Sequence, residues 1–128
     1  MKKKFNEGFT LIELVIIMVI LGVLAAIAVP RLGTTIGSSE EAAEEAVIGS
    51  LRSALEIAAM DSLAQDSQKR YPNNPFSALD AKTADGLLNN SWTYDPISHN
   101  IRHTRNSGEN QDWDYDKSNG EIEIVILP

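Results

Sequence analysis

The most apolar stretch of the chain covers residues 9–29 and contains one charged residue, Glu13. At a rise of about 1.5 Å per residue, a helix over this stretch would be roughly 30 Å long, which is the thickness of the hydrocarbon core of a bilayer. Lys2, Lys3 and Lys4 precede it, and basic residues before an apolar segment hold that end in the cytoplasm. The pattern therefore predicts a single membrane-spanning helix with its amino terminus in the cytoplasm.

Glu13 does not suit a plain membrane anchor. A carboxylate in the hydrocarbon costs on the order of 2.5–3.5 kcal/mol, although a position near the end of the helix lets it reach partly toward the interface. An acidic residue at such a place is a functional candidate that needs a partner. Because the stretch holds no other charge, we expect a partner within the membrane to come from another chain or from a chain terminus.

Gly22 and Pro30 are the weak points of this helix. Inside a helix, proline loses one backbone hydrogen bond and clashes with the preceding turn at a cost of about 3 kcal/mol in water, and glycine costs up to about 1 kcal/mol relative to alanine. We expect the helix to end or to kink near Pro30. Residues 31–37 then contain two glycines and two threonines, and we expect a bend there.

An amphipathic helix is predicted from Ser38 to about Ser67, with Ser38 and Glu41 spaced as a capping box at its start. Its apolar residues recur at steps of three or four, which places them on one face. They are Ile48, Leu51, Leu55, Ala58 or Ala59, and Leu63. Four glutamates in the first turns suit the helix dipole, and we expect this acidic face to be solvated. They are Glu40, Glu41, Glu44 and Glu45.

The middle of the chain has the weakest pattern. Polar residues from Gln65 to Pro75 end the amphipathic helix and form a loop. Between Phe76 and Asn90 we expect a short helical turn over residues 77–82. Leu87 and Leu88 are expected to pack on the amphipathic helix.

The last third contains a short internal repeat. Trp92-Thr93-Tyr94-Asp95 and Trp113-Asp114-Tyr115-Asp116 are each followed by an isoleucine, nine residues after the tryptophan in both cases. Turn-forming residues follow each aromatic segment, and the second turn includes Asn-Gly, which is a strong hairpin signal. Residues 121–126 alternate and then become wholly apolar, as in a half-buried strand. The repeat predicts two hairpins, which supply four antiparallel strands.

These elements give an α+β fold class. A long amino-terminal helix spans the membrane in its first half and packs in its second half against a small four-stranded antiparallel sheet. The face of the sheet that carries the Trp and Tyr rings is expected to lie on the amphipathic helix. Trp92 and Trp113 are therefore interpreted as core residues and not as a platform that stacks on a ligand.

Two groups of side chains have spacings that resemble metal sites. Asp112, Asp114 and Asp116 alternate, with Glu123 eleven residues after Asp112, as in an EF-hand loop. The position that needs glycine for the sharp turn is Lys117, so we expect a solvated acidic edge and not a calcium site.

His99 and His103 are four residues apart, but they lie in a predicted turn and strand, where their rings need not converge. The chain has no cysteine and no Ser–His–Asp pattern beyond chance. We therefore expect no catalytic residue, no cofactor and no metal.

The start of the apolar stretch carries a recognisable motif. Gly8-Phe9-Thr10-Leu11-Ile12-Glu13-Leu14, after a short basic leader, resembles the class III signal sequence of type IV pilins and type II secretion pseudopilins. In that family a membrane prepilin peptidase cuts between the glycine and the phenylalanine and N-methylates the new amino terminus. The resemblance makes Gly8 the residue before the cut, Phe9 the methylated residue and Glu13 the assembly glutamate. It extends through about Pro30, more loosely along the following helix, and not beyond Tyr71.

The resemblance implies a structural role. The chain would be a subunit of a pilus-like filament, with a leader at 1–8, a transmembrane and filament-core helix at 9–30, an amphipathic second half at 31–67 and a globular region at 68–128. Its partners would be copies of itself and other pilins, prepilin peptidase, an inner-membrane assembly platform and, before assembly, membrane lipid. Its location would be the bacterial inner membrane, and then an extracellular pilus or a periplasmic pseudopilus. In filaments of this family, the segment around Gly22 and Pro30 would lose helicity.

Composition narrows the partners further. The formal net charge is −7, and removal of residues 1–8 would make the side-chain charge more negative. This argues against nonspecific nucleic-acid binding, because phosphates would be repelled. Many type IV pilins close a carboxy-terminal loop with a disulfide, and this cysteine-free chain departs from them. The departure is compatible with pseudopilins and with cysteine-free pilins.

Three other interpretations remain open at this point. The chain could be a type II secretion pseudopilin, whose short fibre pushes folded cargo outward. The basic start, the apolar core and Ala26-Ile27-Ala28 also fit an ordinary secretory signal peptide cut after Ala28. An unprocessed single-pass anchor has the same topology, although it leaves Glu13 without a role.

Overall fold

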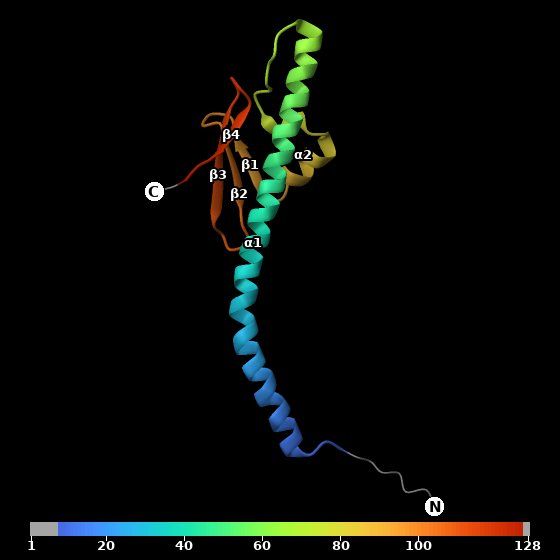
Figure 1. Cartoon of the computed structure of the whole chain (residues 1–128), viewed down its shortest axis with the longest axis vertical. Helices are drawn as coiled ribbons and strands as arrows, with labels where there is room; N and C mark the ends of the chain where they lie inside the picture. The colour runs from blue at the N-terminus through green and yellow to red at the C-terminus, as the bar shows by residue number, and fades with distance from the viewer. Residues whose placement is uncertain (1–7, 127–128) are drawn as a thin grey trace, which may run out of the picture. The chain divides into compact units, whose positions relative to one another are not determined.

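The computed structural model describes residues 8–126, apart from the side chains of residues 32–34, and is drawn in Figure 1. The chain divides after Ser39 into two compact units. In chain order its elements are α1 (Leu11–Asp66), the 3-10 helix η1 (Pro75–Ala78), α2 (Ala81–Leu88), β1 (Trp92–Asp95), β2 (Asn100–Thr104), β3 (Asn110–Asp116) and β4 (Glu121–Ile124). A long amino-terminal helix followed by a four-stranded antiparallel sheet confirms the predicted α+β class.

α1 continues through both predicted weak points. Pro30 lies inside it, so the predicted end of the helix at that residue is wrong. Residues 31–37 are helical too, and Ser38 therefore lies within α1 and does not start a new helix. The hydroxyls of Thr35 and Ser39 donate to the carbonyls of Arg31 and Thr35 at 3.0 and 2.8 Å, which satisfies these polar side chains inside the helix. The predicted capping box at Ser38 is accordingly wrong.

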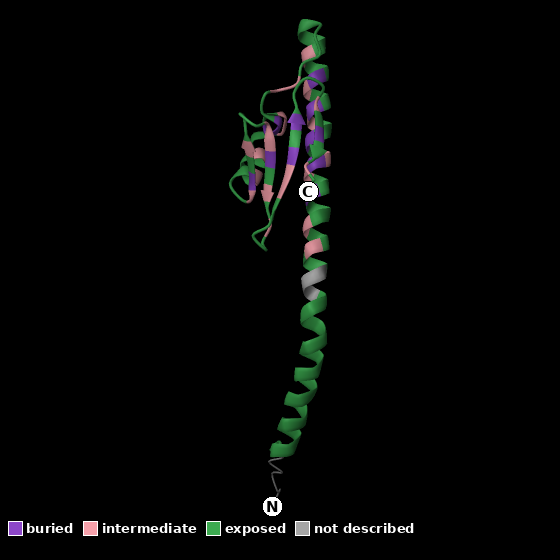
Figure 2. Cartoon of the chain, turned by 90° about the vertical axis from the view of Figure 1, so that its left-hand side faces the viewer, coloured by how far each residue is buried: buried purple, intermediate pink, exposed green. Residues whose placement is uncertain are grey.

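One face of α1 contributes to the core of the second unit. Ile48, Leu51, Leu55 and Ala59 are buried, as their spacing predicts. Leu63, at the end of the same pattern, is 42% exposed. Figure 2 shows the buried residues on the sheet and on this part of α1, whereas described residues 8–31 are exposed.

The sheet is a simple meander with the order β1-β2-β3-β4, and all its neighbours are antiparallel. The two predicted hairpins, β1–β2 and β3–β4, are confirmed. Trp113 lies opposite Ile101 of β2 and Ile124 of β4, so the repeat places its aromatic and aliphatic residues on one face. Trp92 and Trp113 are each 5% exposed and their rings stack at 5.4 Å, which confirms their core role.

The segment between α1 and the sheet differs from the prediction. Helical structure occurs as η1 and as α2, not as one turn over residues 77–82. A capping side chain stands at the start of each helix. Asn74 Oδ1 accepts from the Phe76 N–H at 3.0 Å at the start of η1, and Asp80 Oδ1 accepts from the Thr83 N–H at 3.1 Å at the start of α2. Leu87 packs against the core as expected, but Leu88 is exposed.

Candidate functional site

The amino-terminal candidate site begins in the segment before α1. The helix starts at Leu11, so the peptide bond between Gly8 and Phe9 lies outside it. Both residues are exposed, and the side chain of Phe9 is 85% exposed. An exposed bond outside regular structure is the kind that a peptidase can approach.

Glu13 already has a partner within its own chain. The Thr10 N–H donates to Glu13 Oε2 at 2.8 Å, and the Glu13 N–H donates to Thr10 Oγ1 at 3.3 Å. This reciprocal pair is a capping box, and it satisfies two amides at the start of α1. The cap gives Glu13 a hydrogen-bond partner that was not predicted, while a partner for its charge from another chain or a chain terminus stays a prediction. The spacing Thr-x-x-Glu ahead of an apolar run was the signal that could have revealed the cap.

The apolar stretch after this cap has no protein covering. An 18-residue window of α1 has a mean hydropathy of 3.0, and none of it is buried. By length and composition, α1 is the one helix among the described residues that could cross a membrane. Exposed apolar area of this extent must be covered by lipid or by other protein chains.

The aspartates of β3 lie on the face of the sheet that is turned away from α1. Both carboxylate oxygens of Asp112 accept hydrogen bonds from Arg102, each at 2.7 Å, and this pairing lowers the pKa of Asp112. Asp116 accepts from the Ser118 N–H in the following turn at 2.8 Å. Asp114 lies opposite Glu123. Among the described residues, no group of three or more His, Asp or Glu side chains is placed to hold a metal ion.

The two histidines are not brought together. His99 lies in the turn before β2 with a φ of 58°. The ring of His103 stacks on Trp92 at 4.6 Å, and its Nδ1 lies 2.7 Å from Glu44 Oε1. Because a carboxylate only accepts hydrogen bonds, His103 Nδ1 carries the proton in this contact.

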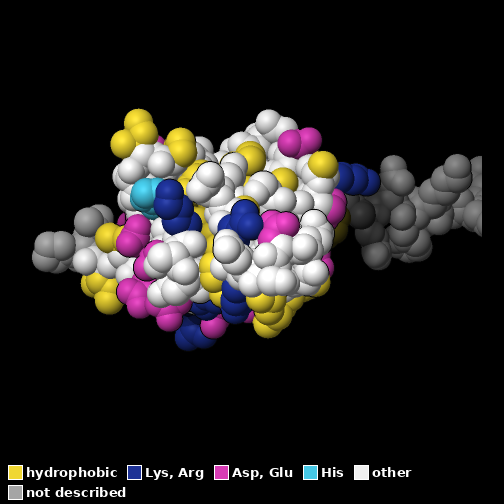
Figure 3. Space-filling view, turned by 90° about the horizontal axis from the view of Figure 1, so that it is seen from above, with side chains coloured by type: hydrophobic (Ala, Val, Ile, Leu, Met, Phe, Trp, Pro, Cys, Tyr) yellow, Lys and Arg dark blue, Asp and Glu magenta, His cyan; other side chains and the backbone are white. Residues whose placement is uncertain are grey.

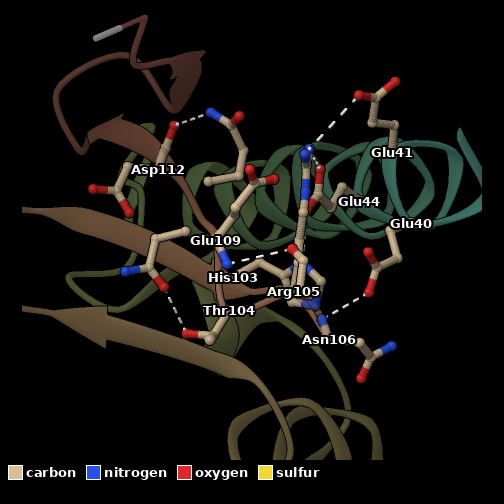
Figure 4. Close-up of polar contacts among 12 residues, drawn as sticks. Glu40, Glu41, Glu44, His103, Thr104, Arg105, Asn106, Glu109 and Asp112 are labelled. Carbon is tan, nitrogen blue, oxygen red and sulfur yellow. Dashed lines mark hydrogen bonds and ion pairs between the residues drawn. The ribbon is translucent and has the colours of Figure 1, made fainter. Parts of the chain in front are cut away.

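Glu44 is the centre of a buried polar cluster that ties α1 to β2 and the turn that follows it (Figure 4). Arg105 donates to both of its oxygens, from Nε at 2.8 Å and from Nη2 at 2.6 Å. Glu40 Oε1 accepts from the Asn106 N–H at 2.8 Å, and Glu41 lies 3.9 Å from Arg105. The prediction that all four glutamates are solvated is therefore wrong for Glu44, which is 3% exposed.

Charge pairing governs the ionisation of this cluster. The hydrogen bonds from Arg105 hold the pKa of Glu44 below its usual value, against the desolvation that raises it, and His103 lowers it further. Glu44 in turn raises the pKa of Arg105. The partners lie 59 and 61 residues from Glu44 in sequence, and no local pattern could have revealed them.

The amino-terminal motif matches a known protein family. A family model described as the prokaryotic N-terminal methylation motif matches residues 3–29. Type IV major fimbrial protein FimA from Dichelobacter nodosus is 33% identical over 94 residues, or 73% of this chain and 59% of FimA. Type II secretion system core protein G from Aeromonas hydrophila is 34% identical over 84 residues, or 63% of this chain and 52% of that protein. The chain is therefore similar in sequence to type IV pilins and to a type II secretion pseudopilin.

A third similar protein is a component of a narrow pilus. Type IV narrow pilus major component PilA5 from Thermus thermophilus is 48% identical over 52 residues, or 41% of this chain and 45% of PilA5. The chain thus spans about half the length of the curated relatives it matches. No solved structure gave a significant match. The apolar helix and these relatives together fit a membrane-anchored pilin.

Proposed function

We propose that the chain is a structural subunit of a type IV pilus-like filament. The observation that carries the proposal is the position of the methylation motif, which lies at the start of an exposed apolar helix that leads into a folded unit. Such a helix needs lipid in one state and other subunits in the next. The function is one of assembly and not of catalysis.

The proposed maturation has two covalent steps. Prepilin peptidase hydrolyses the bond between Gly8 and Phe9 with one water molecule, and a methyl group is then transferred from a methyl donor to the new amino group of Phe9, which loses a proton. Before this, the precursor spans the inner membrane through residues 9–30 with its amino terminus in the cytoplasm, as the three lysines favour. The exposure of Gly8 and Phe9 ahead of α1 supports access to the bond.

In the filament, Glu13 would meet the positive amino terminus of a neighbouring subunit. Oε2 is bonded to Thr10 within the chain, and no described residue donates a hydrogen bond to Oε1. A charge pair in surroundings of low dielectric offsets the cost of burying the carboxylate, and an unpaired charge would be expensive. The pair would therefore set the register of addition on the assembly platform. Gly22 and Pro30 would be the points where α1 loses helicity as subunits pack.

A pseudopilin is the second candidate, favoured by the similarity to type II secretion system core protein G. Both candidates share the cut, the methyl group and the filament. The phenotype of a deletion strain separates them: loss of surface filaments indicates a pilus subunit, and retention of secreted proteins in the periplasm indicates a pseudopilin.

Mass spectrometry of the amino-terminal peptide tests the proposal. We expect a mature chain that begins with N-methylated Phe9. A chain that begins at Val29 would overturn the proposal and indicate a secretory signal peptide. An intact amino terminus would indicate an unprocessed anchor.

A further inference from the structure

We propose that the β1–β2 turn of one copy docks through Ile97 into a groove between α1 and β4 of the next copy. This inference rests on the proposed function, because it specifies which surfaces of the folded units meet in a filament. The experiments described below can contradict this contact without contradicting the proposed function.

Ile97 is an apolar side chain held outward on a fixed turn. It is 89% exposed, more than any other large hydrophobic side chain described in the second unit. The Ile97 N–H donates to Asp95 Oδ1 at 2.9 Å, and Ser98 Oγ donates to Asp95 Oδ2 at 2.7 Å. These bonds hold the turn in one conformation, so little conformational entropy remains to be lost when the turn docks.

The groove, which we call the α1–β4 groove, combines apolar and charged side chains. Its apolar lining is Ile48 of α1, Trp113 of β3 and the 55% exposed Ile124 of β4. Its polar lining consists of Glu41, Glu44, Glu45, Arg52, Arg105 and Gln111. Its volume of about 390 Å³ exceeds that of one branched aliphatic side chain. Docking Ile97 there would remove apolar area from water on both sides.

The two surfaces lie at opposite ends of the sheet. In a four-stranded meander, the β1–β2 and β3–β4 turns share one end, and the β2–β3 turn lies at the other. Arg105 and Gln111, which flank the β2–β3 turn, also line the α1–β4 groove. A contact between opposite ends of two copies is heterologous, and contacts of this kind propagate into helical filaments when they do not close into a ring.

Charge complementarity selects a second copy as the occupant. Lys117 lies on the β3–β4 turn, at the same end of the sheet as Ile97, and forms no ion pair among the described residues. Glu45 is exposed and lines the groove, as does Glu41, which also lies 3.9 Å from Arg105 of its own chain. Seen from above, small groups of hydrophobic side chains lie beside Lys and Arg side chains (Figure 3). With Ile97 seated, Lys117 would approach these glutamates of the next copy.

Cysteine cross-linking in the full-length chain tests the contact, since the natural sequence contains no cysteine. We expect filaments of the double variant Ile97→Cys, Ile124→Cys to give a ladder of covalent multimers on a non-reducing gel after oxidation. A disulfide needs Cβ atoms about 3.5–4.5 Å apart, so the ladder requires the two positions to meet. Filaments of each single variant should run as monomers on the same gel, because a heterologous contact does not bring two copies of the same position together.

The matched control is Ile97→Cys combined with Ile57→Cys, since Ile57 is a 64% exposed residue of α1 outside the groove. It should give no ladder. Filaments of the Ile97–Ile124 double variant whose subunits show no cross-linked ladder on the gel would overturn the proposed contact while leaving the filament function intact. Absence of filaments from the unsubstituted chain would instead overturn the proposed function.

If the cysteine variants form no filaments, exchanging the charges of Lys117 and Glu45 tests the contact instead. Lys117→Glu and Glu45→Lys should each lower the yield of sheared filaments, and the two changes together should restore it. Filament yields that are unaffected by the single changes, or that are not restored in the double variant, would overturn the contact.

Discussion

Glu13 has two carboxylate oxygens and two separable tasks. One oxygen caps the start of α1 through Thr10, and the other is proposed to meet a neighbouring subunit. Glutamine keeps an oxygen that can accept from the Thr10 N–H but carries no charge, whereas leucine can do neither. The two substitutions therefore separate the cap from the charge.

We expect Glu13→Leu and Glu13→Gln to reach the membrane at least as well as the natural chain, because a costly buried charge is gone. Removal of the leader should persist, since the bond after Gly8 is untouched. Filaments should be lost in both, because an incoming positive terminus would lack a counter-charge, a defect of about 3–5 kcal/mol per subunit. Membrane level, leader removal and sheared filaments are measured together.

Normal filaments from Glu13→Gln would show that the cap and not the charge matters. Loss of the protein from the membrane would assign Glu13 to insertion or stability and remove its assembly role.

Glu44 is the residue whose replacement should most weaken the folded unit. Glu44→Gln removes the charge that Arg105 faces in a site that is 3% exposed. Breaking a buried pair from one side costs about 3–5 kcal/mol, and we expect the free energy of unfolding to fall by roughly this amount at pH 7. Urea denaturation followed by Trp fluorescence measures it. The control is Glu45→Gln at an exposed position, which should change stability by less than about 0.5 kcal/mol.

The effect of Glu44 should depend on pH in one direction. Its folded-state pKa is depressed, so its contribution is fully present above the unfolded pKa of about 4.3 and is lost as pH falls through the folded value. The difference in stability between the natural chain and Glu44→Gln should therefore be largest near neutral pH and shrink in acid. A difference that does not change with pH would show that the cluster acts through packing alone.

Among the elements, the β3–β4 turn carries the strictest steric demand. Gly120 has a φ of 78°, and a Cβ there would overlap the ring of Tyr71. We expect Gly120→Ala to destabilise the unit by about 1–3 kcal/mol from the backbone alone, and by more because Tyr71 must move. Gly108→Ala is the matched control, since Gly108 has a φ of 86° but open space around it. Equal melting temperatures for the two variants would show that the Tyr71 contact does not matter.

Elements with local signals were predictable, and those fixed by distant contacts were not. The alternation around Trp92 and Trp113 and the Asn119-Gly120 turn gave both hairpins correctly. α2 has eight residues, including a glycine, and its place depends on the Asp80 cap and on packing of Leu87. The burial of Glu44 depends on partners about sixty residues away, so its sequence neighbours indicated a solvated face.

The whole molecule should separate into a part that needs a membrane and a part that does not. A fragment that begins at Ser38 removes the apolar stretch and keeps the buried core. We expect it to be soluble and to melt cooperatively, whereas the full chain should require detergent or lipid. Circular dichroism with thermal melting and gel filtration measures this. Helical signal without a cooperative transition would contradict an independent core in the second unit.

The meander order of the sheet has a consequence for the speed of folding. Each strand pairs only with its neighbours in sequence, so every strand pairing closes a short loop. Distant residues are joined by the packing of α1 on the sheet and by contacts of the segment before η1, such as the hydrogen bond from Tyr115 Oη to the carbonyl of Pro72. Domains dominated by such local closures fold quickly, because little chain entropy is lost before contacts form. The absence of cysteine also means that no oxidant has to act first. A unit of this kind is expected to fold quickly, so its unpaired strand edges are exposed to neighbouring chains for only a short time.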